Sequence, residues 1–521
     1  MADSSASPEL SLSTSDLVES IVTSSRPLGE AERGHILTRG IHGFSDCYVI
    51  VILDGPVERL IPNDHVVLAC AALRIRHPLL SSHVSFAGLN PEYVCAAPMS
   101  EQHALKETKD MIEFSSFQTR DQPVAALRKR WSEGTDPRDV LDIRQGTIRF
   151  AWMSGIGAAE GQYVFGLQIP HFATDGHRQI LIVRQFLELL ADIDRAHGEL
   201  MGHFSGPRRP LRLPDNLEAI LPDIQTSEAQ MTEAQAAYDK LTQASTLPRA
   251  GRIPDGTGAR DRTIPREVLR VWPREDTRRI LSACKAHGVS ITQVIAAAMA
   301  LAIMEAHANL ELPSSISLNE PQGFILNHAI DLTPRAQPSA KAAEPELALR
   351  IVTFPVFLAA PPSAYAVAHE METLWSLAKQ CRENTLAFVQ SPNFWQFMYL
   401  ARDTLAEDFF SRVAGEPSVP YLSSVGDLDS ELPMHYQFIS SSATAPQGSQ
   451  EDHTQSLAIS KLILGIKANP FVDTVSLWTF DRQLHINIFH SASRMTPALM
   501  DPYIRRIHDI ISRLSVVAHK L

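Results

Sequence analysis

Continuous apolar runs alternate with amphipathic stretches along this chain, and this alternation constrains its fold more than any other feature. Tyr48–Leu53 reads Tyr-Val-Ile-Val-Ile-Leu, a largely β-branched run that predicts a strand covered on both faces. Asp64–Arg76 follows with apolar residues at helical spacing, and Pro78 ends it. A strand followed by a helix in this way predicts an α/β fold of mixed sheets.

The same pairing returns in both halves of the chain, which suggests internal pseudo-symmetry. A long amphipathic stretch after residue 176 has apolar residues three and four apart, as a helix packed on a sheet requires. The further predicted strands are Thr147–Met153, Gln162–Ile169, Ile351–Leu358, Val475–Phe480 and Leu484–Phe489, and the further predicted helices include Ser227–Thr242, His369–Glu383 and Pro502–Leu514.

The 521 residues exceed what one hydrophobic core usually holds, so two lobes are expected. Residues 1–25 are Ser-rich and predict a loose tail, and residues 26–205 form the predicted N-terminal lobe. Residues 206–265 are interrupted by prolines and predict a connection between the lobes. Residues 266–521 form the predicted C-terminal lobe.

Charge and cysteine content argue against several classes of structure and function. Lys and Arg number 47 and Asp and Glu 59, so the net charge is 47 − 59 = −12, which disfavours binding to nucleic acid or anionic membranes. Five cysteines without a Cys-x-x-Cys pair argue against a disulfide framework and a zinc knuckle. No signal peptide is predicted from residues 1–16, and Ile291–Met304 predicts a buried helix too short to span a bilayer. A soluble, cytoplasmic protein is expected.

The glycine-rich segment Ser154–Gly161 superficially matches a dinucleotide-binding fingerprint. That fingerprint requires a helix after the glycines, whereas here a predicted strand follows, so a hairpin loop is the better interpretation. The sequence also has no phosphate-binding loop of the Gly-x4-Gly-Lys-Ser/Thr type and no Gly-x-Ser-x-Gly nucleophile elbow.

The segment whose residues are best suited to catalysis is His171–His177, which lies between a predicted strand and a predicted helix. The imidazole of His171 can act as a general base near neutral pH, Asp175 can fix the loop, and Gly176 permits a close approach. Three other interpretations stay open: a structural histidine, a metal site formed by His171, Asp175 and His177, and a Ser-His-Asp triad. No supporting ligand cluster or nucleophile signature accompanies the last two, and His177 is expected at the helix start without a catalytic role.

These residues resemble a known family. His171-x-x-x-Asp175-Gly176 resembles the signature of the acyl-CoA-dependent acyltransferase superfamily, which includes alcohol acyltransferases and the condensation domains of peptide synthetases. Ala71–Leu80, which ends in His-Pro-Leu-Leu, and Leu422–Asp429, which contains Ser-Ser-Val-Gly, resemble two further segments of that family in the same order. The likeness extends over most of the chain.

Two differences from the family's motifs narrow the set of members that the chain resembles. The Asp-Phe-Gly-Trp-Gly motif of the plant enzymes is absent, and Pro170 stands where condensation domains usually have a second histidine. The chain therefore looks most similar to stand-alone enzymes of the fungal trichothecene 15-O-acetyltransferase type. A free acyl-CoA is the donor that this implies, because no carrier-protein signature accompanies the motif.

The resemblance implies two chloramphenicol-acetyltransferase-like lobes with a tunnel at their interface and His171 inside it as the general base. Residues 420–435 would cross between the lobes beside the tunnel, where Ser423, Ser424 and Gly426 would contact the oxyanion or the donor. The alternative that Ser423 and Ser424 are only turn residues stays open. Asp175 and Gly176 would be structural, Asp175 through an arginine for which Arg149 is a candidate.

The implied reaction moves an acyl group, most simply acetyl, from CoA to a hydroxyl of a small secondary metabolite. The implied enzyme is a monomer and has no bound cofactor or metal. Two alternatives from other classes stay open: a condensation or cyclisation without acyl-CoA, and a non-catalytic module that binds small molecules.

Overall fold

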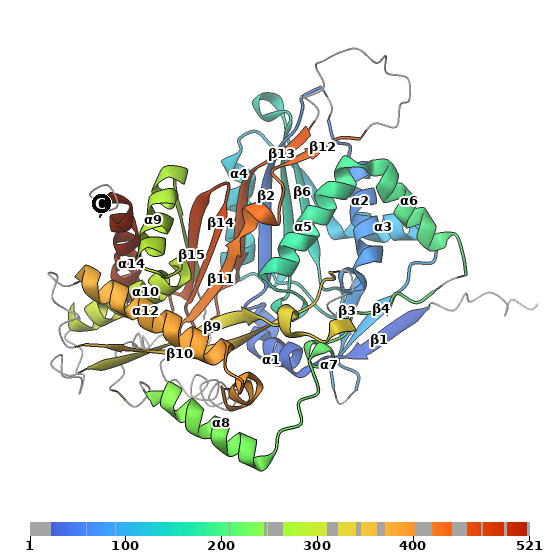
Figure 1. Ribbon diagram of the computed structural model, residues 1–521. Helices are drawn as coiled ribbons and strands as arrows, with labels where there is room; N and C mark the ends of the chain where they lie inside the picture. The colour runs from blue at the N-terminus through green and yellow to red at the C-terminus, as the bar shows by residue number, and fades with distance from the viewer. Residues whose placement is uncertain are drawn as a thin grey trace, which may run out of the picture.

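A computed structural model gives the architecture of the chain. Two six-stranded sheets stand side by side, each with helices packed against it, and a small three-stranded sheet flanks the first (Figure 1). The predicted α/β fold with two mixed sheets is therefore confirmed. The residues described are 22–58, 60–88, 90–207, 209–243, 247, 264–309, 321–339, 345–361, 370–401, 419–439, 456–469, 472–493 and 497–517.

The sheet of the N-terminal lobe contains the predicted two-sided strand. Its strands are, in spatial order, β12 (His435–Gln437), β13 (Ser456–Ile466), β2 (Cys47–Asp54), β7 (Gln162–Ile169), β6 (Arg149–Gly155) and β5 (Ile112–Phe117). Only β5 and β6 are parallel neighbours in this sheet. Alternate residues of β2 face two different cores, Val49 and Val51 one and Ile50 and Ile52 the other. Both faces of β2 are covered, as its uninterrupted apolar run predicts.

Helices cover both faces of this sheet. α2 (Asn63–Arg76) and α5 (Gly176–Ala191) share a core with one face, and α4 (Asp121–Glu133) packs on the other. Phe186 of α5 stacks on Phe165 of β7 with ring centroids 4.0 Å apart. The other elements of this lobe are β1 (Thr23–Pro27), β3 (Ser82–Ser85) and β4 (Glu92–Ala96), α1 (Glu30–Arg39), α3 (Glu101–Met111) and α6 (Ile193–Phe204), and the short turns η1 (Gly40–His42), η2 (Pro78–Ser81), η3 (Pro137–Asp139), η4 (Gly157–Ala159) and η5 (His171–Ala173).

The second sheet has helices on one face, which enclose a large apolar core. In spatial order its strands are β10 (Ile351–Ala360), β9 (Gln322–Asp331), β11 (Tyr421–Asp427), β14 (Thr474–Phe480), β15 (Gln483–Ser491) and β8 (Pro265–Trp272). The helices of this core are α9 (Arg274–Ala286), α10 (Ile291–Asn309), α12 (Glu370–Val389) and α14 (Pro497–Val517). Val294–Met304 of α10 is buried throughout, so the predicted buried helix is confirmed.

Four strands of each sheet repeat one arrangement. β2, β7 and β6 are successive antiparallel neighbours and β5 adds in parallel, and the same relations join β8, β15, β14 and β11. In both lobes the hairpin leads into a long helix, α5 after β7 and α14 after β15. The suggested pseudo-symmetry is therefore present in the strand order and direction.

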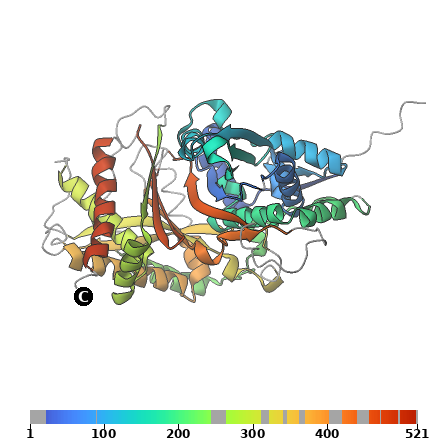
Figure 2. The same cartoon turned by 90° about the horizontal axis from the view of Figure 1, so that it is seen from above.

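The predicted division into lobes must be corrected for His435–Gln437 and Ser456–Ile466. β12 and β13 lie in the N-terminal sheet, where β13 pairs with β2 from Cys47 to Asp54, although residues 266–521 were predicted to form the C-terminal lobe. The chain passes from β11 in one sheet to β12 and β13 in the other and returns to β14 (orange segments in Figures 1 and 2). The crossing is therefore longer than residues 420–435, and β13 covers an edge of β2 that would otherwise be unpaired.

Two further predictions concern the ends of the first lobe. Thr23–Pro27 pair with β4, so the predicted tail at residues 1–25 overlaps a strand, and residues 1–21 lie outside the described residues. The predicted connection at residues 206–265 contains α7 (Leu217–Ile220) and α8 (Glu228–Leu241), the latter capped by Ser227 as its sequence indicates.

All five cysteines are buried, and none forms a disulfide. Within the described part of the chain, no single helix is both long and apolar enough to cross a bilayer, although α9 and the first part of α10 meet that criterion together, across a bend of 90°.

Candidate active site

The predicted motif lies in the loop between β7 and α5. His171–Ala173 form the single turn η5, and the backbone is extended at Thr174 and Asp175 before α5 begins at Gly176. Phe172 and Ala173 are fully buried, and the Phe172 carbonyl accepts a hydrogen bond of 3.1 Å from the Tyr93 hydroxyl. The loop is therefore anchored in the apolar core between its polar groups, His171 and Asp175.

The His171 ring is partly buried and is held in one tautomer. Its Nδ1 lies 3.0 Å from the carbonyl oxygen of Thr174. Because a carbonyl can only accept, Nδ1 carries the proton, and in the neutral ring Nε2 bears a free lone pair. Among the described residues, Nε2 has no hydrogen-bond partner. This geometry equips His171 to take a proton from an incoming group.

The metal interpretation of the motif finds no support in the described residues, which contain no group of three or more His, Cys, Asp or Glu side chains able to hold a metal ion. His177 lies in the first turn of α5 and pairs with Glu431, 3.0 Å away, just after the short turn η10 (Leu428–Ser430). The hydrogen bond that the His177 ring donates to the Glu431 carboxylate raises the pKa of His177. His177 therefore ties α5 to the segment that crosses between the lobes.

Asp175 is engaged by two backbone amides. Its side chain caps α5 by accepting from the Arg178 N–H at 3.0 Å, and its other oxygen accepts from the Arg350 N–H at 3.0 Å, just before β10. The residue is 1% exposed, and burial raises the pKa of its carboxyl group, against which the Arg178 charge acts. Asp175 thus joins the motif loop to the other lobe.

The prediction that Arg149 is the arginine partner of Asp175 was wrong. The guanidinium of Arg149 donates to the carbonyls of Arg138, Asp139 and Val140 at 3.2 to 3.4 Å. Two arginines do contact Asp175, Arg178 and Arg350, but both do so through the backbone. A backbone amide belongs to every residue type except proline, so the sequence carries no signal for these partners.

The predicted crossing segment touches the start of α5. In β11, the Ser424 hydroxyl lies 2.9 Å from the Thr292 hydroxyl at the start of α10, while the side chain of Val425 faces Gly176. A Cβ atom at Gly176 would lie 3.1 and 3.2 Å from the two methyl groups of Val425, so a glycine permits this approach. Gly426 has a φ of +90° beside an irregularity in the pairing of β11 with β14.

The motif and the crossing segment are therefore brought together, but the predicted serines are not bonded to the histidine. Ser423 and Ser424 are both partly exposed, and among the described residues neither hydroxyl makes a hydrogen bond to His171.

One residue near the motif was missed by the sequence analysis. The ring of His35, in α1, stacks on the ring of His171 with centroids 4.5 Å apart and planes inclined by 21°. Burial and the nearby His171 hold the pKa of His35 well below its usual range. Glu32, His35 and Arg39 are spaced three and four apart, which places them on one face of a helix, and this polar face is the signal that could have drawn attention to α1.

Among the cavities that the described residues line are two in the N-terminal lobe, and neither of these borders His171. The larger, of about 310 Å³, lies where α6 ends and α3 begins, and the smaller, of about 20 Å³, lies between Leu60 and Phe438. The passage open at both ends that the resemblance implies stays a prediction.

Comparisons with known proteins were made by sequence and by structure. Neither a family model nor a curated protein matches the sequence. The fold is similar to that of a trichothecene 15-O-acetyltransferase from Fusarium sporotrichioides, with a TM-score of 0.71 and 15% identity over 94% of this chain and 95% of that one. It is also similar to the first condensation domain of the calcium-dependent antibiotic synthetase in complex with a substrate analogue, with a TM-score of 0.59 and 15% identity over 94% and 96% of the two chains.

A third solved structure, the condensation domain of the monacolin K polyketide synthase, matches with a TM-score of 0.54 and 14% identity over 95% of this chain and 98% of that one. The resemblance predicted from the motif is confirmed at the level of the fold, over nearly the whole chain. Because one fold can support different chemistry, the activity has to be argued from the site.

Proposed function

We propose that this protein is an acyl-CoA-dependent O-acyltransferase that acylates a hydroxyl group of a small molecule, with His171 as the general base. The observation that carries the proposal is the bond between Nδ1 of His171 and the Thr174 carbonyl, because it leaves the Nε2 lone pair free. The loop that bears this nitrogen is joined to the other lobe through Asp175, as a base between two lobes requires. The similar acetyltransferase fold agrees with this assignment.

In the proposed reaction, Nε2 of His171 takes the proton of the acceptor hydroxyl as its oxygen attacks the thioester carbonyl carbon. The resulting tetrahedral oxyanion collapses, the carbon–sulfur bond breaks, and the imidazolium returns its proton to the leaving thiolate. The products are an ester and CoA with a free thiol. A positioned general base contributes about 10²–10⁴-fold to such a rate.

The oxyanion requires a donor, for which Ser424 is the proposed residue. Its hydroxyl is held by Thr292 at the start of α10, and it lies in the strand that contacts the motif helix through Val425. Ser423 and Gly426, in the same strand, are proposed to contact the acyl donor. A hydroxyl fixed before the reaction stabilises developing charge without reorganising.

A second candidate donor is an acyl group on a pantetheine thioester that is not CoA. The similar folds of two condensation domains favour this alternative, whereas Pro170, in place of the histidine usual in those domains, disfavours it. The base and the bond changes would be the same, so the two donors differ only in what lies beyond the pantetheine arm.

The test is a transfer assay with acetyl-CoA and a set of hydroxylated small molecules, followed by thiol release and product mass. His171→Ala is expected to lower turnover by about 10²–10⁴-fold. The matched control is His197→Ala, which removes an exposed imidazole on α6 that pairs with Glu101. Micromolar acetyl-CoA is also expected to raise the melting temperature of the wild-type protein, because a ligand bound by the native state stabilises it.

The outcomes separate the alternatives. Full turnover by a folded His171→Ala variant would overturn the general-base role. Transfer from acetyl-pantetheine but not from acetyl-CoA would replace the donor and keep the base. If neither thioester shifts the melting temperature or is consumed, the acyltransferase function is wrong and a binding module is the better description.

A further inference from the structure

We infer that His35 is a positioning residue that fixes the plane of the His171 imidazole, and this inference rests on the proposed function. The two rings lie face to face, with centroids 4.5 Å apart and an interplanar angle of 21°. They come from segments far apart in the sequence, and α1 packs directly on the turn that carries His171. The stack is thus a tertiary contact on the face of the proposed base.

One hydrogen bond does not determine where Nε2 points. The bond from Nδ1 to the Thr174 carbonyl fixes one atom of the His171 ring, but the ring can still rotate about that contact. A flat partner against the ring face removes this rotation. Together the hydrogen bond and the stack define the direction of the Nε2 lone pair, and the rate of proton transfer depends strongly on that direction.

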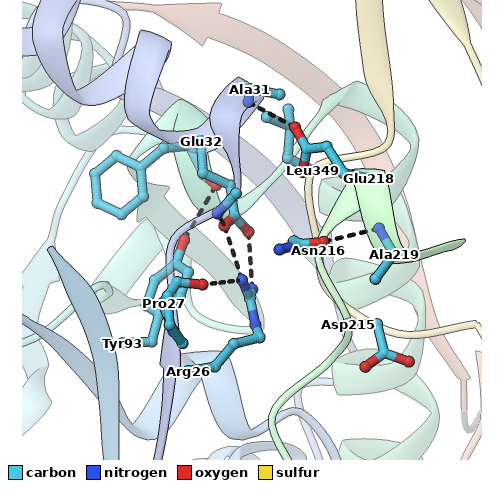
Figure 3. Close-up of polar contacts among 12 residues, drawn as sticks. Arg26, Pro27, Ala31, Glu32, Tyr93, Asp215, Asn216, Glu218, Ala219 and Leu349 are labelled. Carbon is cyan, nitrogen blue, oxygen red and sulfur yellow. Dashed lines mark hydrogen bonds and ion pairs between the residues drawn. The ribbon is translucent and has the colours of Figure 1, made fainter. Parts of the chain in front are cut away.

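α1 is held firmly enough to serve as this partner. At its N-terminal end, Glu32 is 1% exposed, accepts from the Gly29 N–H at 2.6 Å and pairs with Arg26 at 2.8 Å (Figure 3). Glu218 of α7 accepts from the Ala31 N–H at 2.9 Å, so a second carboxylate lies at the helix N-terminus (Figure 3). Both negative charges are favourable there because the helix dipole is positive at that end.

The C-terminal end of α1 is held by a second buried ion pair. Arg39 donates to both oxygens of Asp46, at 2.6 and 2.8 Å, and to the Leu141 carbonyl at 2.6 Å. Glu32 and Arg39 are on the same face of α1 as His35, one turn before it and one turn after it. The His35 ring is therefore supported from both sides along the helix.

Burial, together with the nearby His171, keeps His35 neutral. On α1, Glu32 and Arg39 are engaged in ion pairs. From β4, Tyr93 donates to the Phe172 carbonyl, and from the motif loop, Asp175 is engaged by two amides. Among the described residues, the charge that acts on His35 is that of His171, which together with burial lowers the pKa of His35. A neutral partner lets His171 take a proton without an adjacent positive charge.

The test compares His35→Ala, which removes the ring, with His35→Phe, which keeps a flat ring without nitrogens. Leu37→Ala is the control on the same helix, because Leu37 is 72% exposed. His35→Ala is expected to lower kcat by roughly tenfold to a hundredfold, as misplacement of a reacting group does, with little change in KM for the donor. His35→Phe is expected to restore most of that loss, and Leu37→Ala to retain the wild-type kcat.

The second measurement is the ¹⁵N NMR spectrum of the His171 ring, which needs no substrate. In the wild-type protein and in His35→Phe, the two ring nitrogens are expected to show distinct shifts typical of a single Nδ1–H tautomer. In His35→Ala, the two shifts are expected to move toward each other as the ring becomes mobile. If His171→Ala keeps full turnover the proposed function fails, whereas this spectrum still reports on the stack.

Two results would overturn the inference. One is a folded His35→Ala variant with unchanged kcat and an unchanged His171 ring spectrum. The other is a His35→Phe variant that loses as much rate as His35→Ala while its His171 spectrum remains that of the wild-type protein, because the ring face would then not be what matters. If His35→Ala is too unstable to purify, a His35→Phe variant whose kcat falls by tenfold or more while its His171 ring spectrum remains that of the wild-type protein would by itself overturn the inference.

Discussion

Two hairpin-and-helix units of this molecule share one architecture but differ in the loop that joins hairpin to helix. In the N-terminal lobe, β6 and β7 lead through Pro170–Asp175 into α5, and in the second lobe, β14 and β15 lead through Ala492–Thr496 into α14. The first loop contains His171 and Asp175, whereas the second contains neither histidine nor aspartate.

The two loops also differ in what they contact. Asp175 of the first loop reaches the Arg350 amide of the other lobe, and His177 beyond it reaches Glu431 of the crossing segment. In the described part of the second loop, Ala492 bonds to the Ile264 carbonyl, next to β8 of the same sheet. The repeated unit therefore provides the scaffold, and the loop that faces the other lobe provides the candidate chemistry.

Of the substitutions that test the difference between the two loops, Asp175→Ala is expected to have the largest effect on the free energy of unfolding. It removes a helix cap and leaves the buried Arg350 amide without a partner, which together cost roughly 2–4 kcal/mol of unfolding free energy. Asp192→Ala is the matched control, because Asp192 caps the neighbouring helix α6 in the same way, and within the described part of the chain its side chain forms no hydrogen bond or ion pair with the other lobe. Denaturant unfolding of both variants measures the difference.

For Asp192→Ala we expect a loss of about 1 kcal/mol, as for an ordinary cap. Asp175→Asn should fall between the two, because one of its two acceptors is kept. An Asp175→Ala variant that is no less stable than Asp192→Ala but has lost activity would contradict the anchoring role, and the loop would then not be tied to the other lobe in the way described.

A smaller effect is expected from Gly176→Ala. The added methyl group would press on Val425 of the crossing strand at 3.1 Å, which costs about 1 kcal/mol and lowers turnover by up to about tenfold. Gly198→Ala is the control, because its Cβ would meet open space on α6 and should stabilise the protein by about 0.5–1 kcal/mol.

Combining Gly176→Ala with Val425→Ala sharpens this result. If the methyl group acts by pressing on Val425, the double variant should recover part of the lost turnover, because the two changes are coupled. Additive losses would show that Gly176 matters for another reason, such as the start of the helix itself.

The smallest effect on stability is expected from removing the ion pair of His177 with Glu431. Since the pKa of His177 is raised above 6.5 in the folded protein, the pair stabilises below pH 6.5 and its contribution disappears as the pH rises through the raised value. Both side chains are about one-third exposed, so the contribution is about 0.2–1 kcal/mol. Thermal unfolding of the wild-type protein and His177→Gln between about pH 5.5 and about pH 8.5 measures it.

The difference between the two proteins should be largest at the acidic end of this range and absent at the basic end. A constant difference over the whole range would mean that His177 stabilises the crossing segment by packing and not by its charge.

The parts of the fold that were predicted correctly depend on local patterns. The apolar run of β2 indicated a strand covered on both sides, and the glycines between β6 and β7 indicated a hairpin, because both follow from side-chain alternation and backbone freedom. The loop with His171 was recognisable because strand, motif and helix are consecutive in the chain.

The parts that were missed depend on contacts between distant segments. Nothing in the apolar pattern of Ser456–Ile466 identifies β2 as the strand that it pairs with, because side-chain alternation does not name a partner strand. The stack of His35 on His171 joins residues that are far apart in the sequence, and the amides that hold Asp175 carry no residue identity. Local periodicity therefore located the motif but not its partners.

The pairing of β13 with β2 has a consequence for how the chain is made. Most of the first sheet leaves the ribosome early, yet the strand that covers the open edge of β2 is synthesised hundreds of residues later. Until then, the newly made N-terminal half exposes an unpaired edge that can join to other chains. Completion of this lobe must wait for nearly the whole polypeptide, and protection of that edge by a chaperone during translation would favour a good yield of folded protein.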